Sequence, residues 1–483
     1  MDRQPNINKL VYGKISWMTN QILKITLNEF RDKAKEIAII GGGLAGLTAA
    51  VYLSRNGKSV TIIEKSSEFG GRARTSVKDG FYFNQGPHAL YPAGIAPKIL
   101  DELNVKYKGK KVDYTKYFVT NKGKLYQSPI KLSQLLTTRL LKGLGSKIET
   151  IRFFIKLNKM NLDGLHRISF QDWLDKNFKN SDSKDFVIML GRISTYTYNA
   201  ETLSAKLALN QIKTAISGGV IYIDEGWQTL VGQLVEIAKS NGVKFVYGKN
   251  VVSVKQSHDT NGTNRQPVWK IRLSENSVIS FHDVIIATNP SHVYNLLKYN
   301  TSISPEFLSQ IEKMDRPARV ATLDIALSSL PNPNVYGAYG MDVPLYLSLH
   351  SAFAKLSTDR KGVLFHAIKY LDSSAAPNPV QDKMELEGLL DMVQPGWRKM
   401  VVRQRFLPNM IASNTFLNNN NNNKDIMDNR PDIKVPGVDS LYIIGDWVGP
   451  EGMLVDTSFA SAKAVALKIL AENRGIEIHE GKQ

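Results

Sequence analysis

A glycine-rich turn near the start of this 483-residue chain constrains its fold more than any other feature. Residues 37–40 form a short apolar run without alternation, which is typical of a buried parallel strand. Gly41, Gly43 and Gly46 follow at the spacing of a dinucleotide-binding loop. In such a loop the first glycine permits a tight turn, the second lets backbone N–H groups approach a pyrophosphate, and the third allows close helix packing. The chain is therefore predicted to contain a Rossmann-like α/β domain.

An acidic residue at the end of the next expected strand supports this prediction. Residues 47–54 continue as a helix that ends at Asn56-Gly57, and residues 60–63 form the second strand. Glu64 stands roughly 20 residues after the glycines, where an acid accepts hydrogen bonds from ribose hydroxyls. Such an acid repels a 2′-phosphate, which disfavours NADP but does not separate NAD from FAD.

A second glycine motif near the other end of the chain favours FAD. Residues 441–444 are another short apolar run, followed by Gly445 and Asp446. Asp446 can accept hydrogen bonds from ribityl hydroxyls or act on the phosphates through water. Gly452 and Met453 precede an expected helix at 455–471, whose N-terminal dipole would stabilise negative charge on a reduced flavin. Because FAD is long enough to need several loops, the pairing of two distant motifs points to this cofactor.

The segment that begins at Glu64 resembles a known family. Glu64-Lys65 through Gly70-Gly71-Arg72-Ala73-Arg74-Thr75 is similar to the motif of the superfamily of FAD-dependent amine oxidases, phytoene desaturases and protoporphyrinogen oxidases. Similar segments follow at 83–91, 224–230, 251–254, 283–290 and 445–454. The resemblance implies that the Gly-Gly-Arg stretch lies against the FAD diphosphate and ribityl chain. It also implies that residues 83–91 pass near the isoalloxazine and that residues 251–254 bracket the adenine.

The motifs and the resemblance together predict three sets of site residues. The cofactor-binding set is Gly41, Gly43, Leu44, Ala45, Gly46, Glu64, Lys65, Gly71, Arg72, Gly86, Pro87, His88, Val252, Gly445, Asp446, Gly452, Met453 and Leu454. The catalytic candidate is His88, the titratable residue of its motif, although a structural histidine would fit there too. The substrate set is Arg192, Thr195, Tyr196, Tyr198 and Trp447. A buried helix would also use such aromatic residues, and Trp447 could simply pack in a core.

Cysteine and histidine usage narrows the chemistry. The chain has no cysteine, which excludes disulfides, the Cys-pair redox class of flavoproteins and a Cys-linked flavin. FAD is therefore expected to bind non-covalently. The eight histidines are scattered without metal-ligand spacing, so no metal site is predicted.

The family pattern predicts two interleaved domains after an N-terminal extension at 1–35. The discontinuous FAD-binding domain is expected at 36–105, 218–290 and 436–472. The α+β substrate-binding domain is expected at 106–217, which looks basic and largely helical, and at 291–435. In the second interval, apolar runs at 321–327, 345–349 and 362–367 indicate strands of a sheet. A run of six asparagines at 418–423 is low in complexity and is assigned no function.

The net charge of +18 is concentrated at 106–159, where basic residues alternate with apolar ones at helical spacing. This pattern indicates amphipathic helices, either on an anionic membrane surface or as a solvated basic face over an ordinary core stripe. Nucleic-acid binding is not expected, because no interleaved aromatic platform or known DNA-binding pattern is present. No apolar run reaches the roughly 20 residues that cross a bilayer. We expect a cytoplasmic protein, with peripheral attachment to the inner face of the membrane as one form.

These features favour an FAD-dependent oxidoreductase that dehydrogenates, saturates or isomerises a lipophilic isoprenoid or carotenoid-like substrate. An amine or protoporphyrinogen oxidase is the alternative within enzymes. Amine oxidases often carry a lysine near the flavin, whereas the corresponding region here reads Arg316-Pro317-Ala318-Arg319. A lipid-binding chaperone of the Rab GDP-dissociation-inhibitor type, without flavin chemistry, is the alternative of another class. The electron acceptor and the oligomeric state stay open.

Overall fold

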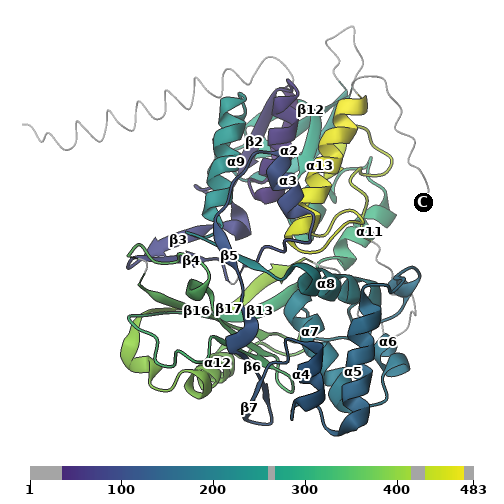
Figure 1. The fold of residues 1–483 in the computed structure, drawn as a ribbon. Helices are drawn as coiled ribbons and strands as arrows, with labels where there is room; N and C mark the ends of the chain where they lie inside the picture. Colours follow the sequence, from purple (N-terminus) through teal and green to yellow (C-terminus); the bar gives the residue numbers. More distant parts are fainter. Residues whose placement is uncertain (1–34, 87, 259–266, 360, 415–429, 473–483) are drawn as a thin grey trace, which may run out of the picture.

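Two seven-stranded sheets organise the chain, one above the other in Figure 1. The computed structural model describes residues 35–86, 88–258, 267–359, 361–414 and 430–472. The predicted extension, apart from Lys35, and the asparagine run lie outside these residues, as does Pro87.

The upper sheet contains the strands predicted from the two glycine motifs. Its order is β10 (Val251–His258), β11 (Pro267–Leu273), β12 (Val278–Ile286), β1 (Lys35–Ile40), β2 (Val60–Glu64) and β9 (Lys244–Tyr247), with β18 (Leu441–Ile443) also paired to β12. Strands β9, β2, β1, β12 and β18 run parallel, and β10 and β11 are antiparallel additions. The described side chains of β1, β2 and β18 are almost completely buried, which explains the continuous apolar sequences of these strands, whereas the edge strand β9 is partly exposed. The expected Rossmann-like α/β fold is confirmed.

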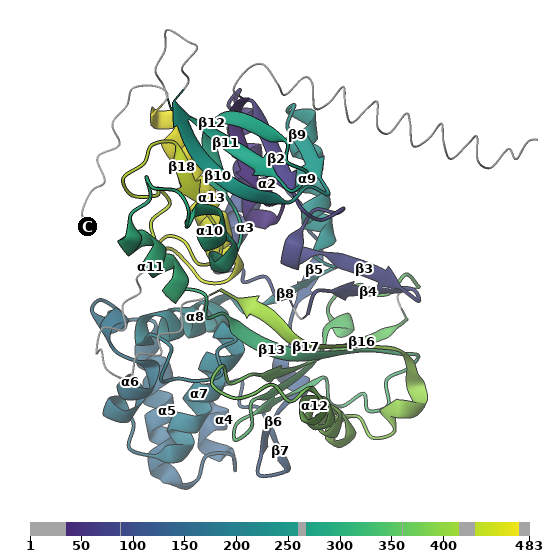
Figure 2. The same cartoon turned by 180° about the vertical axis from the view of Figure 1, so that it is seen from behind.

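Helices cover both sides of the upper sheet. Helices α2 (Leu44–Arg55), α3 (Ala96–Glu102), α9 (Gln228–Ser240) and α13 (Val455–Glu472) pack together on one side (Figure 1). Helices α10 (Pro290–Leu297) and α11 (Pro305–Lys313) lie on the other side, near β10 (Figure 2). Val293 and Phe307 are buried in the core of this sheet. The predicted substrate interval 291–435 therefore begins with two helices that pack with the upper half.

The lower sheet is mostly antiparallel. Its order is β17 (Val401–Ser413), β13 (Ala318–Leu327), β16 (Val363–Tyr370), β15 (Leu345–Leu349), β14 (Gly337–Gly340), β6 (Tyr117–Asn121) and β7 (Lys124–Gln127). One face packs on α12 (Pro379–Val393) through residues such as Leu323 and Ile325. On β13 the alternate residues Val320, Thr322 and Asp324 face the opposite way, because successive side chains of a strand point to opposite faces.

A group of helices lies beside the lower sheet, at lower right in Figure 1. It consists of α4 (Leu132–Thr137), α5 (Gly143–Leu157), α6 (Phe170–Asn177), α7 (Ser181–Thr195) and α8 (Ala205–Gly218). The amphipathic helices predicted from the basic interval correspond to α4 and α5. The expectation that 106–217 is largely helical is wrong in its first part, which forms β5 (Gly109–Lys111), β6 and β7. Tyr117 and Val119 are buried at a spacing of two, which is a strand pattern.

Two short strand pairs complete the fold. Strands β3 (Thr75–Lys78) and β4 (Phe81–Asn84) form a hairpin, and β5 pairs with β8 (Ile221–Ile223). Phe81 and Phe83 are buried in the core above the lower sheet, so the hairpin joins the two halves. Among the described helices, none has both the length and the apolar character needed to cross a membrane.

Candidate functional site

A cavity of about 650 Å³ is lined by residues of both halves of the molecule. Its upper lining comes from the loop after β1, the end of β2, the Gly-Gly-Arg segment and the start of α13. Its lower lining comes from β13, β17 and the end of α7. The lining includes Gly43, Glu64, Lys65, Arg72, Arg74, His88, Tyr196, Lys249, Arg319, Asn409, Met410, Ile411, Ala412, Asn414, Asp446 and Leu454.

Each of the three glycines in the first loop occupies its position for a different geometric reason. Gly41 has φ +111°, and a Cβ there would lie 2.5 Å from the carbonyl oxygen of Ala287. A Cβ on Gly46 would lie 2.1 Å from the carbonyl oxygen of Gly41, so the helix packs closely on the turn. A Cβ on Gly43 would meet no atom within 4 Å, because this glycine borders the cavity. The loop leaves room for a phosphate-sized group at the uncapped N-terminus of α2.

Glu64 and the Gly-Gly-Arg segment are held against this loop. The Glu64 carboxylate accepts hydrogen bonds from the backbone N–H groups of Gly42 at 2.7 Å and Ser66 at 2.8 Å. Gly70 N–H donates to the carbonyl of Gly42 at 2.8 Å. These contacts orient the acid at the end of β2 and place the segment beside the glycine turn, as a dinucleotide site requires.

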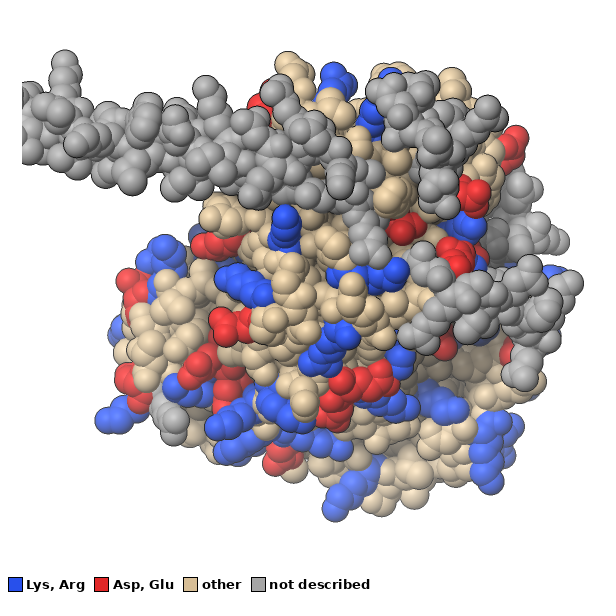
Figure 3. Space-filling model, turned by 90° about the horizontal axis from the view of Figure 1, so that it is seen from above, with Lys and Arg blue, Asp and Glu red and all other residues tan. Residues whose placement is uncertain are grey.

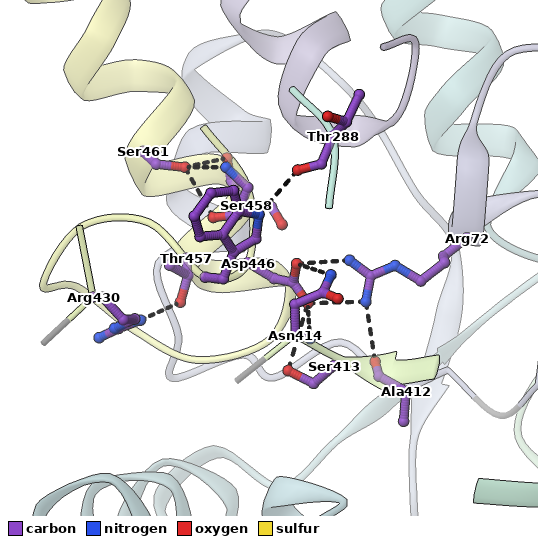
Figure 4. A network of polar contacts seen from close by, with 12 residues as sticks. Arg72, Thr288, Ala412, Ser413, Asn414, Arg430, Asp446, Thr457, Ser458 and Ser461 are labelled. Atoms are coloured by element: carbon purple, nitrogen blue, oxygen red, sulfur yellow. Dashed lines mark hydrogen bonds and ion pairs between the residues drawn. The ribbon is translucent and has the colours of Figure 1, made fainter. Parts of the chain in front are cut away.

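An ion pair joins the Gly-Gly-Arg segment to the second glycine motif through Arg72 and Asp446, which are 374 residues apart in the sequence (Figure 4). Arg72 donates to both carboxylate oxygens of Asp446, at 2.9 and 2.7 Å. Asn414 donates to the same carboxylate from its backbone N–H at 2.8 Å and from its amide at 3.0 Å. Burial alone would raise the pKa of Asp446, but Arg72 and Asn414 hold it below its usual range. Asp446 is therefore an ionised anchor for Arg72 at the edge of the cavity.

The cavity lining is predominantly basic. Lys65, Arg72, Arg74, Lys249 and Arg319 contribute cationic groups, whereas the lining acids are Glu64 and Asp446. Asp446 is already paired with Arg72 and Lys249 with Glu275, so the remaining positive charge of Lys65, Arg74 and Arg319 favours an anionic ligand such as a diphosphate.

His88 and Tyr196 border the lower part of the cavity. The His88 Nδ1 lies 2.9 Å from the carbonyl oxygen of Gly86, which can only accept, so Nδ1 carries the proton and Nε2 is an acceptor. Burial lowers the pKa of His88 to about 4, and the imidazole is neutral at pH 7. Tyr196 ends α7 with φ +62°, a strained conformation for a bulky residue that directs its ring to this place.

Several predicted site residues lie away from the cavity. Arg192 donates to the backbone of Gly340 and Val343, and the Thr195 hydroxyl donates to the backbone within α7. Tyr198 borders a separate small depression. Trp447 is fully buried in the core of the upper sheet and donates to the carbonyl of Thr288 at 2.9 Å, so it packs there rather than at the substrate.

Some predicted cofactor residues also act from behind the lining. Val251 rather than Val252 borders the cavity, and Val252 is exposed because neighbouring strand residues face opposite ways. Gly86 lies behind Met410, which would collide with a Cβ at 2.3 Å. Gly46 lets α2 pack closely on the loop, Gly452 has φ +73° in the turn before α13, and Met453 packs in the helical core. Gly41, Gly43, Leu44, Ala45, Glu64, Lys65, Gly71, Arg72, His88, Gly445, Asp446 and Leu454 do line the cavity.

Strand β17 supplies lining residues that no sequence motif indicated. The end of this strand, just before Asn414, contributes Asn409, Met410, Ile411 and Ala412. They reach the cavity because β17 pairs with β13 across a register with bulges. No local pattern in the sequence announces this pairing.

Comparisons with known proteins agree with this geometry. The family described as flavin containing amine oxidoreductase matches residues 44–320, more than half of the chain, and the chain belongs to this family. Its class is therefore that of FAD-dependent oxidoreductases, and the expected FAD cofactor is confirmed. The chain is also similar, with 16% identity and a TM-score of 0.67, to the structure of putrescine oxidase bound to putrescine, over 91% of this chain and 99% of that one.

Two curated relatives are named for carotenoid chemistry. The chain is 24% identical over 322 residues to 4,4'-diaponeurosporene oxygenase of Staphylococcus aureus (strain USA300), covering 59% of this chain and 61% of that protein. It is 22% identical over 258 residues to 1-hydroxycarotenoid 3,4-desaturase of Flavobacterium sp. (strain P99-3), covering 47% and 52%. The match thus spans about three fifths or less of the length of these relatives.

The residues present fit FAD. The open space beside Gly43 suits the diphosphate, Glu64 suits a ribose, and the Arg72–Asp446 pair lies between the two motifs. The lower lining then faces the part of the cavity left for the ring and the substrate. When bound, FAD supplies a hydride acceptor.

Proposed function

We propose that this protein dehydrogenates, saturates or isomerises a lipophilic isoprenoid of the carotenoid class. The main support for this proposal is the composition of the lower lining, where Tyr196, Met410, Ile411 and Ala412 offer aromatic and apolar surface. Such surface binds a polyene through burial of apolar area, at about 25 cal/mol per Å². The two carotenoid-named relatives support the same substrate class.

The lining also argues against amine oxidation. Of the described lining residues, the two lysines are Lys65 and Lys249, which both lie beside Glu64 at the cofactor end. The cation of the lower lining is Arg319, whose guanidinium donates to the amide oxygen of Asn409 at 3.3 Å. A permanently charged guanidinium repels an ammonium substrate and cannot act as a neutral amine base.

Different residues of this chain would bind the cofactor, orient the substrate and accept a proton. The glycine turn, Glu64 and Arg72 would hold the cofactor, and the apolar side chains of the lower lining would orient the substrate and exclude water. His88 offers a neutral imidazole with its Nε2 as acceptor at the boundary between the two. It can therefore take a proton that the substrate releases.

We further propose that the substrate comes from an anionic membrane through the face of α4 and α5. Leu132, Leu136, Leu144 and Ile155 are between 46% and 67% exposed there. Lys131, Lys142, Lys147, Arg152 and Lys156 lie among them. Basic residues around exposed apolar ones suit an anionic lipid surface, at about 1 kcal/mol per nearby cation. The face seen from above in Figure 3 instead carries basic and acidic side chains interspersed.

The test is anaerobic bleaching of the FAD-loaded protein. If the reaction is a dehydrogenation, the visible flavin absorption should fall when a carotenoid in mixed micelles is added, and it should persist with putrescine or protoporphyrinogen. Bleaching by putrescine or protoporphyrinogen alone would overturn the proposal in favour of the amine or porphyrinogen reaction. A protein that binds prenyl lipid but no FAD would indicate a lipid chaperone instead.

A further inference from the structure

Three of the eight histidines gather beneath the cavity. His88 borders the cavity, while His350 and His366 are buried below it with at most 1% of their surfaces exposed. His350 begins a short helical turn, η4 (His350–Ala352), and its ring centroid lies 4.4 Å from that of His366. The function proposed above does not use His350 or His366.

A row of polar residues crosses the lower sheet at this level. The strand register places Arg405 of β17 opposite Asp324 of β13, Asp324 opposite His366 of β16, and His366 opposite Ser348 of β15. Residues that are directly opposite in a sheet point to the same face. This face is the one directed towards the upper half rather than towards α12.

The centre of the row is a carboxylate–imidazole pair. The Oδ1 atom of Asp324 lies 2.6 Å from Nδ1 of His366, and both side chains are completely buried. Since the carboxylate accepts, Nδ1 carries the proton and Nε2 is left as the free nitrogen. Neither Nε2 of His366 nor Nε2 of His350 has a hydrogen-bond partner among the described residues. Buried polar atoms without partners are costly, so this arrangement calls for a functional reason.

The charges in the row allow His366 to take a proton. Arg405 donates from Nε to the other oxygen of Asp324 at 2.9 Å, and it also contacts the carbonyl of Asn84. Burial alone would raise the pKa of Asp324, but His366 and Arg405 hold it below its usual range. Asp324 is therefore an ionised carboxylate that is paired with Arg405 on one side and lies directly against the imidazole of His366 on the other.

The other groups around His366 stay neutral. Burial and the neighbouring imidazoles of His366 and His88 keep the pKa of His350 well below its usual value. The His350 ring stacks on Tyr222 at 3.6 Å, and burial raises the pKa of that phenol. Ser348 accepts or donates hydrogen bonds with Tyr117 and Tyr222 at 2.8 and 3.0 Å. The phenol of Tyr346 lies 3.1 Å from that of Tyr222, and near the cavity His88 and Arg72 also interact with the cluster.

We propose that Asp324 and His366 form a proton-accepting pair beneath the cavity, which receives the proton that His88 takes from the substrate. The inference rests on the proposed function. Dehydrogenation breaks two C–H bonds and forms one C=C bond, and bound FAD would supply the acceptor for one hydrogen as a hydride with both electrons. The second hydrogen leaves as a proton. Nε2 of His88 accepts this proton and Nε2 of His366 finally holds it, while Nδ1–H of His366 keeps its hydrogen bond to Asp324. His366 is thus a positioning and proton-storing residue that does not contact the substrate.

His366→Asn separates this role from simple packing. The asparagine amide can still donate to Asp324 in place of Nδ1, but it cannot carry an added proton. His282→Asn, on the exposed part of β12, is the matched control. Thermal unfolding of both variants should stay close to that of the wild type, which shows that the fold is kept.

The first readout needs no substrate. The reduction potential of bound FAD is measured against pH with redox dyes, and its slope counts the protons taken up per two electrons. We expect the wild type and His282→Asn to take up one proton more than His366→Asn over part of the pH range in which all three proteins stay folded. Equal slopes in all three proteins would show that His366 is only structural and would overturn the proposal.

The second readout observes the imidazoles directly. In protein labelled with ¹⁵N-histidine, one signal absent from His366→Asn should report the Nδ1–H tautomer and gain a second proton as the pH falls. A signal that never titrates while the protein stays folded would also overturn the proposal. If a polyene bleaches the flavin, His366→Asn should slow that step by about 10–100-fold. If no polyene bleaches it, the proposed function fails while the potential and the spectra still decide on the proton-accepting pair.

Discussion

The upper and lower halves of the molecule build their shares of the cavity in opposite ways. The upper half uses backbone geometry, with Gly41 in a conformation that favours glycine and Gly43 leaving open space. The lower half uses side chains, with Tyr196 reaching the cavity from the end of α7 and the Asp324–His366 pair on the sheet beneath it. A backbone cradle suits a ligand common to many proteins, whereas side chains set the chemistry of one substrate.

The difference also separates two kinds of sensitivity to mutation. In the upper half an added methyl group can block the ligand without disturbing the fold. In the lower half a change removes a partner from a buried polar group, and such removal costs about 1–3 kcal/mol in general. The Arg72–Asp446 pair stands between these cases, because it joins two backbone motifs through side chains.

The largest effect is expected at Gly43. In Gly43→Val the new side chain would occupy the open space beside the loop, where a Cβ meets no protein atom within 4 Å. The backbone there has φ −78°, which valine accepts, so the apoprotein should fold normally. We expect FAD affinity to fall by more than about 100-fold, since the phosphate loses its close approach to the backbone. Fluorescence titration with FAD measures this change.

Gly232→Ala provides the matched control for that experiment. A Cβ on Gly232 also meets no atom within 4 Å, but this glycine lies on α9 and does not line the cavity. Alanine there should leave FAD affinity unchanged. Equal affinity of Gly43→Val and the control would show that the glycine turn does not cradle the cofactor.

A smaller effect is expected for Arg72→Met. The change leaves the buried Asp446 carboxylate with Asn414 as its remaining charge-stabilising partner, and it should cost about 2 kcal/mol in the free energy of unfolding. The folded-state pKa of Asp446 is depressed, so its stabilising contribution is present at neutral pH and is lost as the pH falls below about 4. Urea unfolding at pH 7 and at pH 3.5 should therefore show a smaller pH effect in the variant than in the wild type. An equal pH effect would contradict the anchoring role.

The pH dependence of stability has the opposite sign at Asp456, whose carboxylate holds the start of α3 in the upper half. It accepts from the backbone N–H of Ala96 at 2.7 Å, and burial raises its pKa to about 6. The folded state therefore binds a proton more tightly than the unfolded state, and stability falls as the pH rises from about 4 to above 6. Asp456→Asn should remove this fall and be about 1–2 kcal/mol more stable than the wild type at pH 8. Chemical unfolding at pH 4.5 and pH 8 checks it, and a variant less stable at both values would refute the assignment.

The smallest effect is expected on the outer surface of the lower half. Leu144→Glu combined with Ile155→Glu places charges on the two most exposed apolar side chains of α5. Binding to phosphatidylglycerol vesicles should weaken by about 3–10-fold, because apolar burial and attraction to anionic lipid are both reduced. Leu467→Glu, on an exposed position of α13, is the control and should bind as the wild type does. Sedimentation that is equal for all three proteins would remove the proposed membrane face.

The elements that the sequence predicted well are those set by a local pattern of residues. The unit of β1, α2 and β2 depends on glycine positions and an apolar strand within about 30 residues, and the predicted helix at 47–54 lies inside the observed Leu44–Arg55. Strands β13, β15 and β16 likewise appear where their apolar runs predicted them. Local pattern is enough for such elements, because it directly sets which face is buried.

Features of the lower site escaped prediction because distant strands create them. Asp324 and His366 are 42 residues apart, and each by itself is an ordinary polar residue in an apolar run. Only the register between β13 and β16 brings them together. The lining residues of β17 and the packing of α10 on the upper sheet depend in the same way on pairing that leaves no local signal.

The most direct test of the account is an absorption spectrum of the purified protein, recorded before and after heat release of any bound cofactor. We predict the bands of oxidised flavin before heating and free FAD in the supernatant afterwards, since the chain has no cysteine for a thioether link. A colourless protein that stays colourless when FAD is added would contradict the claim that the two glycine motifs and the Arg72–Asp446 pair form a cofactor site.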